Sequence, residues 1–322
     1  MQKLFKAAAI AAFAGLALSG CSPVTDSKTV VLVTHDSFVI SDQLIHKFEL
    51  ESGYKLKLVK AGDAGAMTNK LILTKDQAIG DAVFGIDNTL TGLAASEHLI
   101  DGKLTPIDFG DVCINYDINW FTAHGITAPD NISQLTEPTY KNLTVVENPA
   151  TSSTGMAFLA ATVAKYGSAG YLGYWTSLKK NGLKVDAGWE DAYYTDFSGS
   201  SGHGAYPIVL SYSSSPADEV RDNGKSQTAS ILNDCYRQTE YAGILKGSKN
   251  PKGAAAIVNF MTSQAFQTAL PEAMYVYPET RGIQLPDTWA KFAPSAKNLV
   301  GDQLDVNGNR KSWLTAWSKL FE

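Results

Sequence analysis

The 322-residue sequence lacks the motifs that several enzyme classes require. It has neither the G-x-x-x-x-G-K-[ST] loop that binds nucleotide phosphates nor the H-E-x-x-H pair that binds zinc, and its five histidines show no metal-ligand spacing. Ser200-Ser201-Gly202 does not match a nucleophile elbow, and the S-x-x-K pattern at Ser177 falls on a predicted amphipathic helix. The sequence therefore carries no clear enzyme signature, and we expect no catalytic residues, no metal and no cofactor.

Charged residues are also sparse, at 18% of the chain, and no excess of basic residues is present. The 27 basic and 32 acidic side chains give a formal net charge of −5, which offers no basic surface for a phosphate backbone. Nucleic acid is therefore excluded as an expected partner.

The 44% apolar content is typical of a globular protein. The length exceeds one typical domain of roughly 100–200 residues, which favours two domains or lobes.

The N-terminus carries a hydrophobic run, Ala7–Leu18, preceded by Lys3 and Lys6. This run is shorter than the ~20 residues that span a bilayer, so it predicts a cleaved export signal over residues 1–20. Its end, Leu18-Ser19-Gly20-Cys21, resembles the bacterial lipobox, in which the cysteine is lipidated and becomes the first mature residue. The alternative is a plain cleavage site beside a cysteine. We expect an extracytoplasmic protein anchored to the membrane through Cys21, with residues 21–28 as a tether.

Strand and helix patterns alternate along the rest of the chain, which indicates an α/β fold. Two series of elements are separated by extended segments near residues 105–116 and 232–242, where the chain is expected to cross between two lobes. Ligands of such proteins bind between the lobes, outside the carboxyl ends of the strands. The expected strands are Thr29–Thr34, Lys55–Lys60, Asp81–Ile86, Leu104–Phe109, Val112–Tyr116, Leu143–Glu147, Pro207–Ser211 and Glu240–Leu245; the expected helices are Ser41–Ser52, Ala66–Thr74, Leu90–Ser96, Ser153–Tyr166, Ala169–Lys180, Pro251–Met261, Gln264–Leu270 and Lys311–Phe321.

Hydroxyl, acidic and glycine residues gather where several of these strands end. They form four clusters, at residues 34–37, 62–65, 148–155 and 211–216. The last two place several hydroxyls and backbone N–H groups before helices, an arrangement suited to polar or anionic groups. Helix capping alone explains one serine per helix but not three in a row.

These residues resemble those of the thiamine-binding proteins of ABC importers, which have the type II periplasmic-binding-protein fold. The likeness runs from about Val30 to Phe321. It implies two lobes, each with a central β-sheet flanked by helices, joined by a two-strand hinge. Residues 29–110 and 238–282 would form one lobe, residues 111–237 the other, and residues 283–322 a helical segment packed on both. The matching motifs are Thr34–Phe38, Phe84–Asn88, Asn148–Gly155, Gly188–Tyr193, Leu210–Ala217 and Phe260–Gln267.

The resemblance implies which residues line the ligand cleft. Thiamine joins a permanent thiazolium cation to a flat aminopyrimidine, so its site needs aromatic faces and a countercharge. Trp189, Tyr212 and Tyr275 supply the faces, and Asp63, with Asp218 second, supplies the charge. His35 stands where relatives carry a tyrosine; it either replaces that aromatic wall or makes binding sensitive to pH near its reference pKa of ~6.5. The remaining implied lining residues are Ala64, Ser152, Ser153, Ser213, Ser214 and Ser215.

With Cys21 lipidated in an oxidising compartment, we expect Cys113 and Cys235 to form a disulfide; two separate buried thiols are the alternative. The resemblance supports the pairing, because it places the two cysteines on the adjacent crossing strands. The predicted function is capture of thiamine, or of its mono- or diphosphate, by a monomer that delivers it to an ABC permease. One alternative is ferric-ion binding, to which Tyr193-Tyr194 and His35 are superficially suited. Ferric-binding relatives, however, carry paired tyrosines where this chain has Tyr212-Ser213. The other is a secreted thiamine-degrading enzyme with a cysteine nucleophile.

Overall fold

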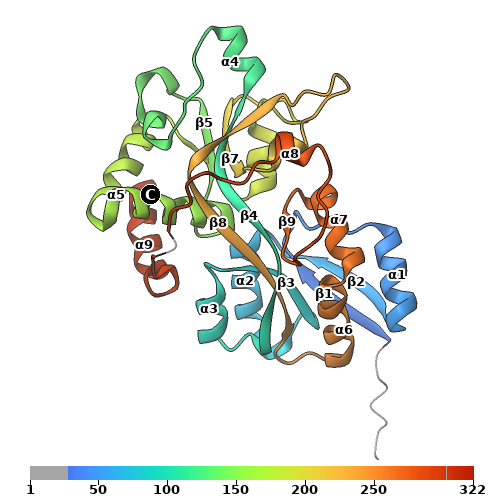
Figure 1. The fold of residues 1–322 in the computed structure, drawn as a ribbon. Helices are drawn as coiled ribbons and strands as arrows, with labels where there is room; N and C mark the ends of the chain where they lie inside the picture. The colour runs from blue at the N-terminus through green and yellow to red at the C-terminus, as the bar shows by residue number, and fades with distance from the viewer. Residues whose placement is uncertain (1–27, 302) are drawn as a thin grey trace, which may run out of the picture.

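The structure is a computed structural model that describes residues 28–301 and 303–322. The predicted signal over residues 1–20, the lipidation site Cys21 and the tether up to residue 27 lie outside the described residues. Figure 1 shows two lobes connected by two long strands, β4 (Ile100–Asp117) and β8 (Thr228–Leu245). Because these strands pair along both lobes, the two expected sheets form one hydrogen-bonded sheet. Its order is β2-β1-β3-β8-β4-β7-β5-β6, and the short β9 (Tyr277–Pro278) pairs with β4.

The first lobe contains the parallel strands β1 (Thr29–Thr34), β2 (Lys55–Lys60) and β3 (Ala82–Asp87). Helices cover both faces of this sheet. In β1, Val30 and Leu32 pack into the core beneath α1 and α6, whereas Val33 packs against Met67 of α2 on the opposite face. Burial on both faces explains why β1 and β3 are almost continuously apolar, whereas β2, at the edge of the sheet, alternates apolar residues with lysines. The helices are α1 (Asp42–Ser52), α2 (Ala64–Leu73), α3 (Thr91–Ser96), α6 (Pro251–Met261) and α7 (Gln264–Met274).

The second lobe contains β5 (Thr144–Glu147), β6 (Lys184–Asp186) and β7 (Ile208–Tyr212), with α5 (Ser153–Lys180) and α9 (Val306–Phe321) packed together beside them. Gly167 interrupts α5 with φ 71° and ψ 169°, which confirms the predicted division into two helical segments. Trp317 of α9 packs edge-on against Trp175, with ring centroids 5.6 Å apart. The terminal tryptophans therefore belong to the core. In the described part of the chain, no helix combines the length and the apolar character needed to cross a bilayer.

Most predicted elements are confirmed, and the differences have local causes. Helix α2 begins at Ala64 rather than Ala66 because the carboxylate of Asp63 caps it. Helix α7 continues through Pro271 to Met274, four residues beyond its predicted end. Several short elements were not predicted, among them α4 (Ile118–His124), α8 (Trp289–Phe292), β6, β9 and the single wide helical turn η4 (Asp191–Asp196). These are too short to show a periodic pattern.

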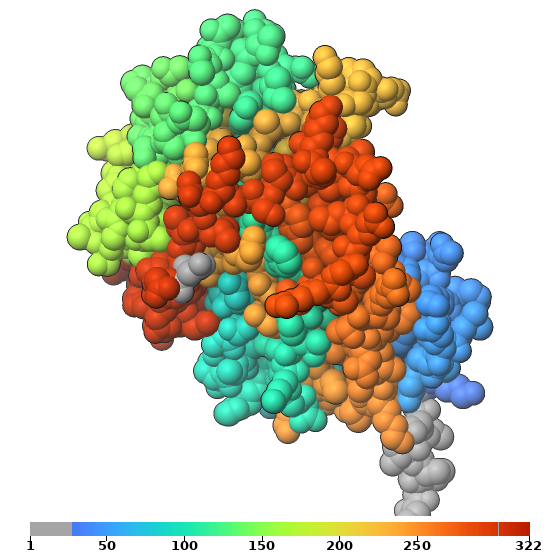
Figure 2. All heavy atoms as spheres, in the orientation of Figure 1, coloured from blue at the N-terminus to red at the C-terminus, as the bar shows by residue number. Residues whose placement is uncertain are grey.

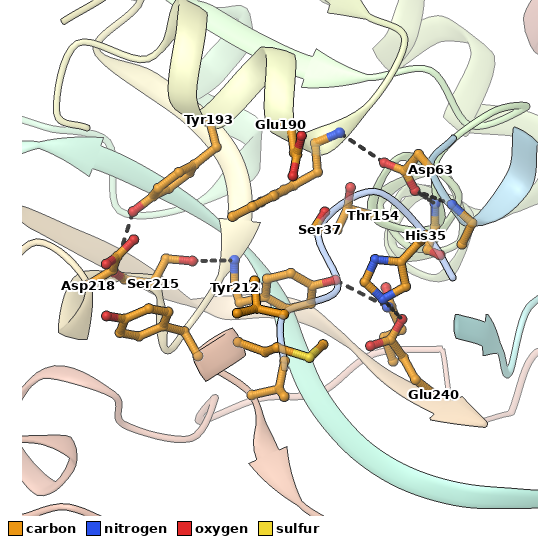
Figure 3. A pocket seen from close by; sticks show the side chains of 18 of the residues that line it. His35, Ser37, Asp63, Thr154, Glu190, Tyr193, Tyr212, Ser215, Asp218 and Glu240 are labelled. Atoms are coloured by element: carbon orange, nitrogen blue, oxygen red, sulfur yellow. Dashed lines mark hydrogen bonds and ion pairs between the residues drawn. The ribbon is translucent and has the colours of Figure 1, made fainter. Parts of the chain in front are cut away.

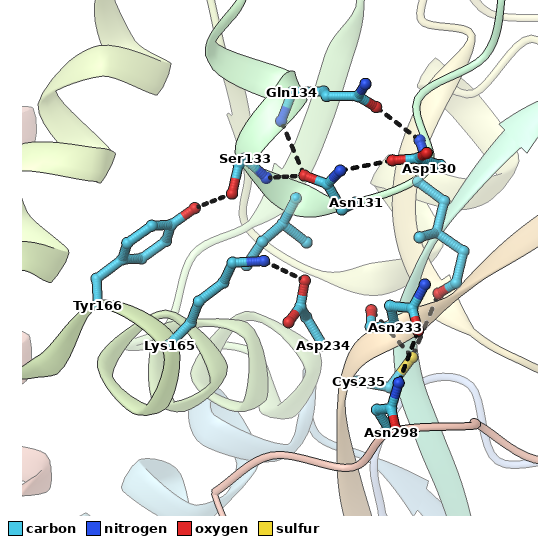
Figure 4. A network of polar contacts seen from close by, with 12 residues as sticks. Asp130, Asn131, Ser133, Gln134, Lys165, Tyr166, Asn233, Asp234, Cys235 and Asn298 are labelled. Carbon is cyan, nitrogen blue, oxygen red and sulfur yellow. Dashed lines mark hydrogen bonds and ion pairs between the residues drawn. The ribbon is translucent and has the colours of Figure 1, made fainter.

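The disulfide between Cys113 and Cys235 is confirmed, and it joins β4 to β8 where the chain passes between the lobes. The two Cα atoms are 4.7 Å apart although 122 positions separate the residues in sequence. The segment after α7 lies across the same region in Figure 2, and Val300 N–H donates to the carbonyl of Cys235 at 2.9 Å. Asp234, which precedes Cys235 on β8, forms an ion pair with Lys165 of α5 (Figure 4). A disulfide, a backbone hydrogen bond and an ion pair thus hold the hinge strands in place.

Removal of this disulfide should reduce stability considerably. In the double variant Cys113→Ala/Cys235→Ala, we expect the free energy of unfolding to fall by about 3–5 kcal/mol, because the bridge closes a loop of more than 100 residues in the unfolded chain. Urea unfolding followed by circular dichroism measures the change. Reductant should destabilise the wild-type protein to a similar extent and leave the double variant unaffected. Equal midpoints for wild type and variant would contradict this expectation.

Candidate functional site

A cavity lies between the lobes and is open to solvent at its mouth. It is at the carboxyl ends of β1, β2, β5 and β7, where ligands of open α/β sheets bind. Figure 3 shows side chains from both lobes converging on it. Eight of the predicted lining residues are on its wall: His35, Asp63, Ala64, Ser153, Trp189, Tyr212, Ser215 and Tyr275.

Aromatic rings form the wall contributed by the second lobe. The indole of Trp189 stacks on Tyr193, with centroids 4.9 Å apart and planes 12° from parallel, and meets the edge of Tyr194 at 5.2 Å. Its Nε1–H donates to Ser211 Oγ at 2.9 Å, which fixes the ring orientation. Tyr194 O–H donates to Asp218 Oδ2 at 3.0 Å, so the wall carries a carboxylate at its edge. Flat aromatic faces next to a carboxylate suit a planar cation.

Asp63 connects the two lobes at the cavity. Its Oδ1 caps α2 by accepting from Ala64 N–H at 2.6 Å and also accepts from Ser153 N–H of the second lobe at 3.4 Å. Its Oδ2 accepts from Trp189 N–H at 2.9 Å. Burial raises the pKa of Asp63, while the hydrogen bonds from these N–H groups oppose the rise. The carboxylate therefore occupies the N-terminus of α5, a position that otherwise attracts anions.

The first turn of α2 touches the second lobe directly. Ala66 N–H donates to the carbonyl of Thr151 at 2.9 Å. A Cβ added to Gly65 would lie 2.7 Å from the carbonyl carbon of Thr151, closer than real Cβ atoms approach. The approach of the lobes at this point therefore depends on a residue without a side chain.

His35 is 7% exposed, and its Nε2 lies 3.4 Å from Glu240 Oε1 (Figure 3). Its ring occupies space that a side chain on Gly85 would fill, since a Cβ there would lie 2.3 Å from His35 Cδ2. Burial, with the nearby charge of Lys60, lowers the pKa of His35 to about 4. The imidazole is neutral at physiological pH, so His35 serves as part of the wall rather than as a switch near pH 6.5.

Two polar residues of β8 form the floor of the cavity. Gln238 and Glu240 are two positions apart on a strand, so both face the same side. Gln238 Nε2–H donates to Tyr212 O–H at 3.1 Å, and its Oε1 is buried without a hydrogen-bond partner. Tyr212 reaches this position across Gly110, where a Cβ would lie 2.6 Å from the tyrosine ring.

Three predicted residues lie behind the wall rather than on it. Ser152 Oγ is 2.9 Å from Thr154 Oγ1, and Ser214 Oγ donates to the carbonyl of Tyr275 at 2.5 Å. Ser213 is fully buried. The serine-rich segments therefore position the wall. The prediction missed Tyr193, Tyr194, Gln238 and Glu240 as lining residues. The only signal for the last two was their spacing of two residues, which places both side chains on one face of a strand.

Two α/β lobes around one polar cavity define a solute-binding protein, and the comparisons with known families agree. The chain belongs to the family of bacterial extracellular solute-binding proteins, which matches residues 75–293. This match includes the second lobe, both hinge strands and part of the first lobe.

Several similar relatives are thiamine-binding periplasmic proteins. The one from Escherichia coli strain K12 is 28% identical, over 92% of this chain and 95% of its own; the one from Brucella suis is 27% identical, over 95% and 96%. A solved periplasmic thiamin-binding protein has a TM-score of 0.81 and 26% identity, covering 91% of this chain and 96% of its own. An iron-bound HitA from Pseudomonas aeruginosa, at 17% identity and a TM-score of 0.70, shares the fold.

Proposed function

We propose that this protein captures thiamine between its two lobes and delivers it to the membrane permease of an ABC importer. The observation that carries the proposal is the cavity lining. Stacked aromatic rings around Trp189 face the carboxyl groups of Asp63, Asp218, Glu190 and Glu240, and the described residues of the lining include no lysine or arginine. A flat, permanently charged cation fits this combination. The thiamine-binding relatives support the same ligand.

The lining favours free thiamine over its phosphate esters. A phosphate would bring two negative charges into a cavity that has four carboxyl groups, and the carboxylate of Asp63 already occupies the N-terminus of α5. We expect thiamine to bind at least about tenfold more tightly than thiamine monophosphate. Quenching of tryptophan fluorescence, on protein unfolded and refolded to remove bound ligand, measures both affinities. Equal affinities would contradict this preference, and absence of thiamine binding would contradict the proposed function.

Closure of the lobes is the proposed mechanism of capture. A ligand shifts the open and closed populations only by contacting both lobes in the closed form. The cavity meets this condition because Asp63 and His35 come from the first lobe and Trp189 and Tyr212 from the second. We further propose the lobe boundaries expected from the sequence, at residues 110/111 and 237/238, a monomeric state, and anchoring through a lipidated Cys21.

Gly65→Ala should impair closure without impairing folding. Alanine is a better helix former than glycine, so the stability of α2 should not fall. The added methyl group would collide with Thr151 in the closed form, and we expect thiamine affinity to fall at least about tenfold. Gly173→Ala is the matched control, because nothing lies within 4 Å of its added Cβ on α5. Calorimetric titration compares the two, and unchanged affinity in Gly65→Ala would show that the lobes need not approach here.

We infer that the protein catalyses no reaction on its ligand. Cys113 and Cys235 are joined in a disulfide, and neither lines the cavity, so neither supplies a thiolate nucleophile there. The relatives are binding proteins. Thiamine incubated with the pure protein should be recovered intact by chromatography, and its loss would favour the enzyme alternative.

A further inference from the structure

Three carboxyl groups lie side by side in the sheet beneath the cavity. Glu240 of β8 pairs directly with Asp87 of β3 on one side and with Asp108 of β4 on the other. Residues directly opposite each other on neighbouring strands project from the same face of a sheet. The side chains of all three are buried, with Asp87 and Asp108 at 0% and Glu240 at 5% exposure.

The three carboxyl groups differ in their partners. Asp87 accepts from Thr89 N–H at 2.5 Å and faces Arg310 of α9. No N–H or hydroxyl donor of the described structure reaches either oxygen of Asp108, whose one side-chain hydrogen-bond partner there is the carboxyl group of Glu240. The free-energy cost of burying an ionised carboxyl group is therefore least compensated at Asp108 and at its neighbour Glu240.

The groups that face Glu240 offer it no cation. They are His35 after β1, Asp63 at α2, Asp87 on β3, Asp108 on β4 and Tyr212 on β7; Asp108 is also faced by Glu279 after β9. The pKa of His35 is about 4, because burial and the charge of Lys60 on β2 lower it, so its ring is neutral at pH 7. Burial and the charge of Asp108 raise the pKa of Glu240 well above its usual range.

Two adjacent buried carboxyl groups cannot both ionise without a positive charge nearby, so in the empty site they share a proton. Glu240 also lines the cavity, next to the unpartnered Oε1 of Gln238. A cation that enters the cavity would provide the missing positive charge, and Gln238 Oε1 would accept a hydrogen bond from an amino group.

We propose that Glu240, supported by Asp108, provides the countercharge for the cationic ligand, and that binding of the cation expels the proton which these two carboxyl groups share. The inference rests on the proposed function and adds the residue that selects for positive charge. The carboxyl O–H bond breaks, the proton passes to the buffer, and the pair becomes doubly ionised against the ligand. Thiamine affinity should therefore increase as the pH rises from about 6 to 8.

Calorimetric titration with thiamine at pH 7 in phosphate and in Tris tests this proposal. The buffers differ in ionisation enthalpy, so the difference in observed heat gives the number of protons released. We expect the wild-type protein to release about one proton per thiamine bound, because Glu240 and Asp108 share one proton in the empty site. Glu240→Gln should bind at least about tenfold more weakly and release none. Glu137→Gln, a matched control that removes an exposed carboxylate outside the cavity lining, should retain both the affinity and the proton release of wild type.

The outcomes separate this inference from the proposed function. Thiamine binding by wild type without proton release, or equal proton release by Glu240→Gln, overturns the inference and leaves the function standing. A wild-type protein that does not bind thiamine overturns both. Melting curves of the empty proteins check folding. Because the pKa of Glu240 is raised in the folded protein, the wild-type protein loses stability as the pH rises above the usual pKa of a glutamate. Glu240→Gln lacks this loss, so its melting temperature should exceed that of wild type, and by more at pH 8 than at pH 5. Asp108→Asn gives the same test if Glu240→Gln does not fold.

Discussion

Replacing Trp189 with alanine should nearly abolish thiamine binding, with affinity reduced at least about 100-fold. The substitution removes the ring that forms the centre of the aromatic wall, stacked on Tyr193 and held by Ser211. The thiazolium cation would lose an aromatic face and gain water in its place. Calorimetric titration of the refolded variant with thiamine measures the loss.

Trp120→Ala is the matched control for this experiment. Trp120 is also half-buried and stacked on a neighbouring ring, that of His124, at 3.8 Å, but it lies on α4 outside the cavity lining. Its removal should leave thiamine affinity unchanged. If Trp189→Ala retained wild-type affinity, the aromatic wall would have no part in recognition. A similar loss in both variants would indicate a general disturbance of the second lobe.

Asp63→Ala should also reduce thiamine affinity at least about 100-fold, because three consequences combine. The variant loses a carboxylate beside the cavity, and it leaves the N–H groups of Ser153 and Trp189 without their acceptor between the lobes. The N-cap of α2 is lost as well, which costs about 1 kcal/mol of stability. Calorimetric titration and urea unfolding measure the two effects separately.

The capping role of Asp63 can be separated from its role between the lobes. Ser41 caps α1 by accepting from Leu44 N–H at 3.3 Å and lies away from the cavity. Ser41→Ala should lose a similar amount of stability and keep full affinity for thiamine. Asp63→Asn retains a capping oxygen but no charge, so its affinity should fall between those of wild type and Asp63→Ala. Wild-type affinity in Asp63→Ala would show that neither the charge of Asp63 nor its contact between the lobes contributes to thiamine binding.

The local sequence contained enough information for the elements of the first lobe. The strand β1 and the helices α1 and α6 have clear apolar patterns and clear ends, such as the cap at Ser41 and the left-handed Gly53 that closes α1. The expectation that ligand residues gather at strand ends placed His35, Asp63, Ser153 and Tyr212 on the cavity wall. These features depend on neighbours within a few residues, which a sequence displays directly.

The unpredicted features depend on contacts between distant segments. The turn η4 has no periodic pattern of its own, and Tyr193 within it packs in a core cluster with Val145 of β5 and Val209 of β7. The role of Glu240 depends on two strands that place Asp87 and Asp108 beside it, from positions more than 100 residues away. The sequence left open whether His35 replaces an aromatic wall or acts as a pH switch; burial, with the charge of Lys60, lowers its pKa to about 4, which favours the wall.

Recognition of a flat cation between the lobes is the central claim, and one calorimetric comparison tests it most directly. The refolded, ligand-free protein would be titrated with thiamine and with thiochrome, a fused-ring derivative of thiamine that has no permanent charge. We predict saturable one-to-one binding of thiamine and at least about 100-fold weaker binding of thiochrome, since only the cation balances the buried carboxyl groups. Equal binding of both compounds, or no binding of thiamine, would contradict the claim.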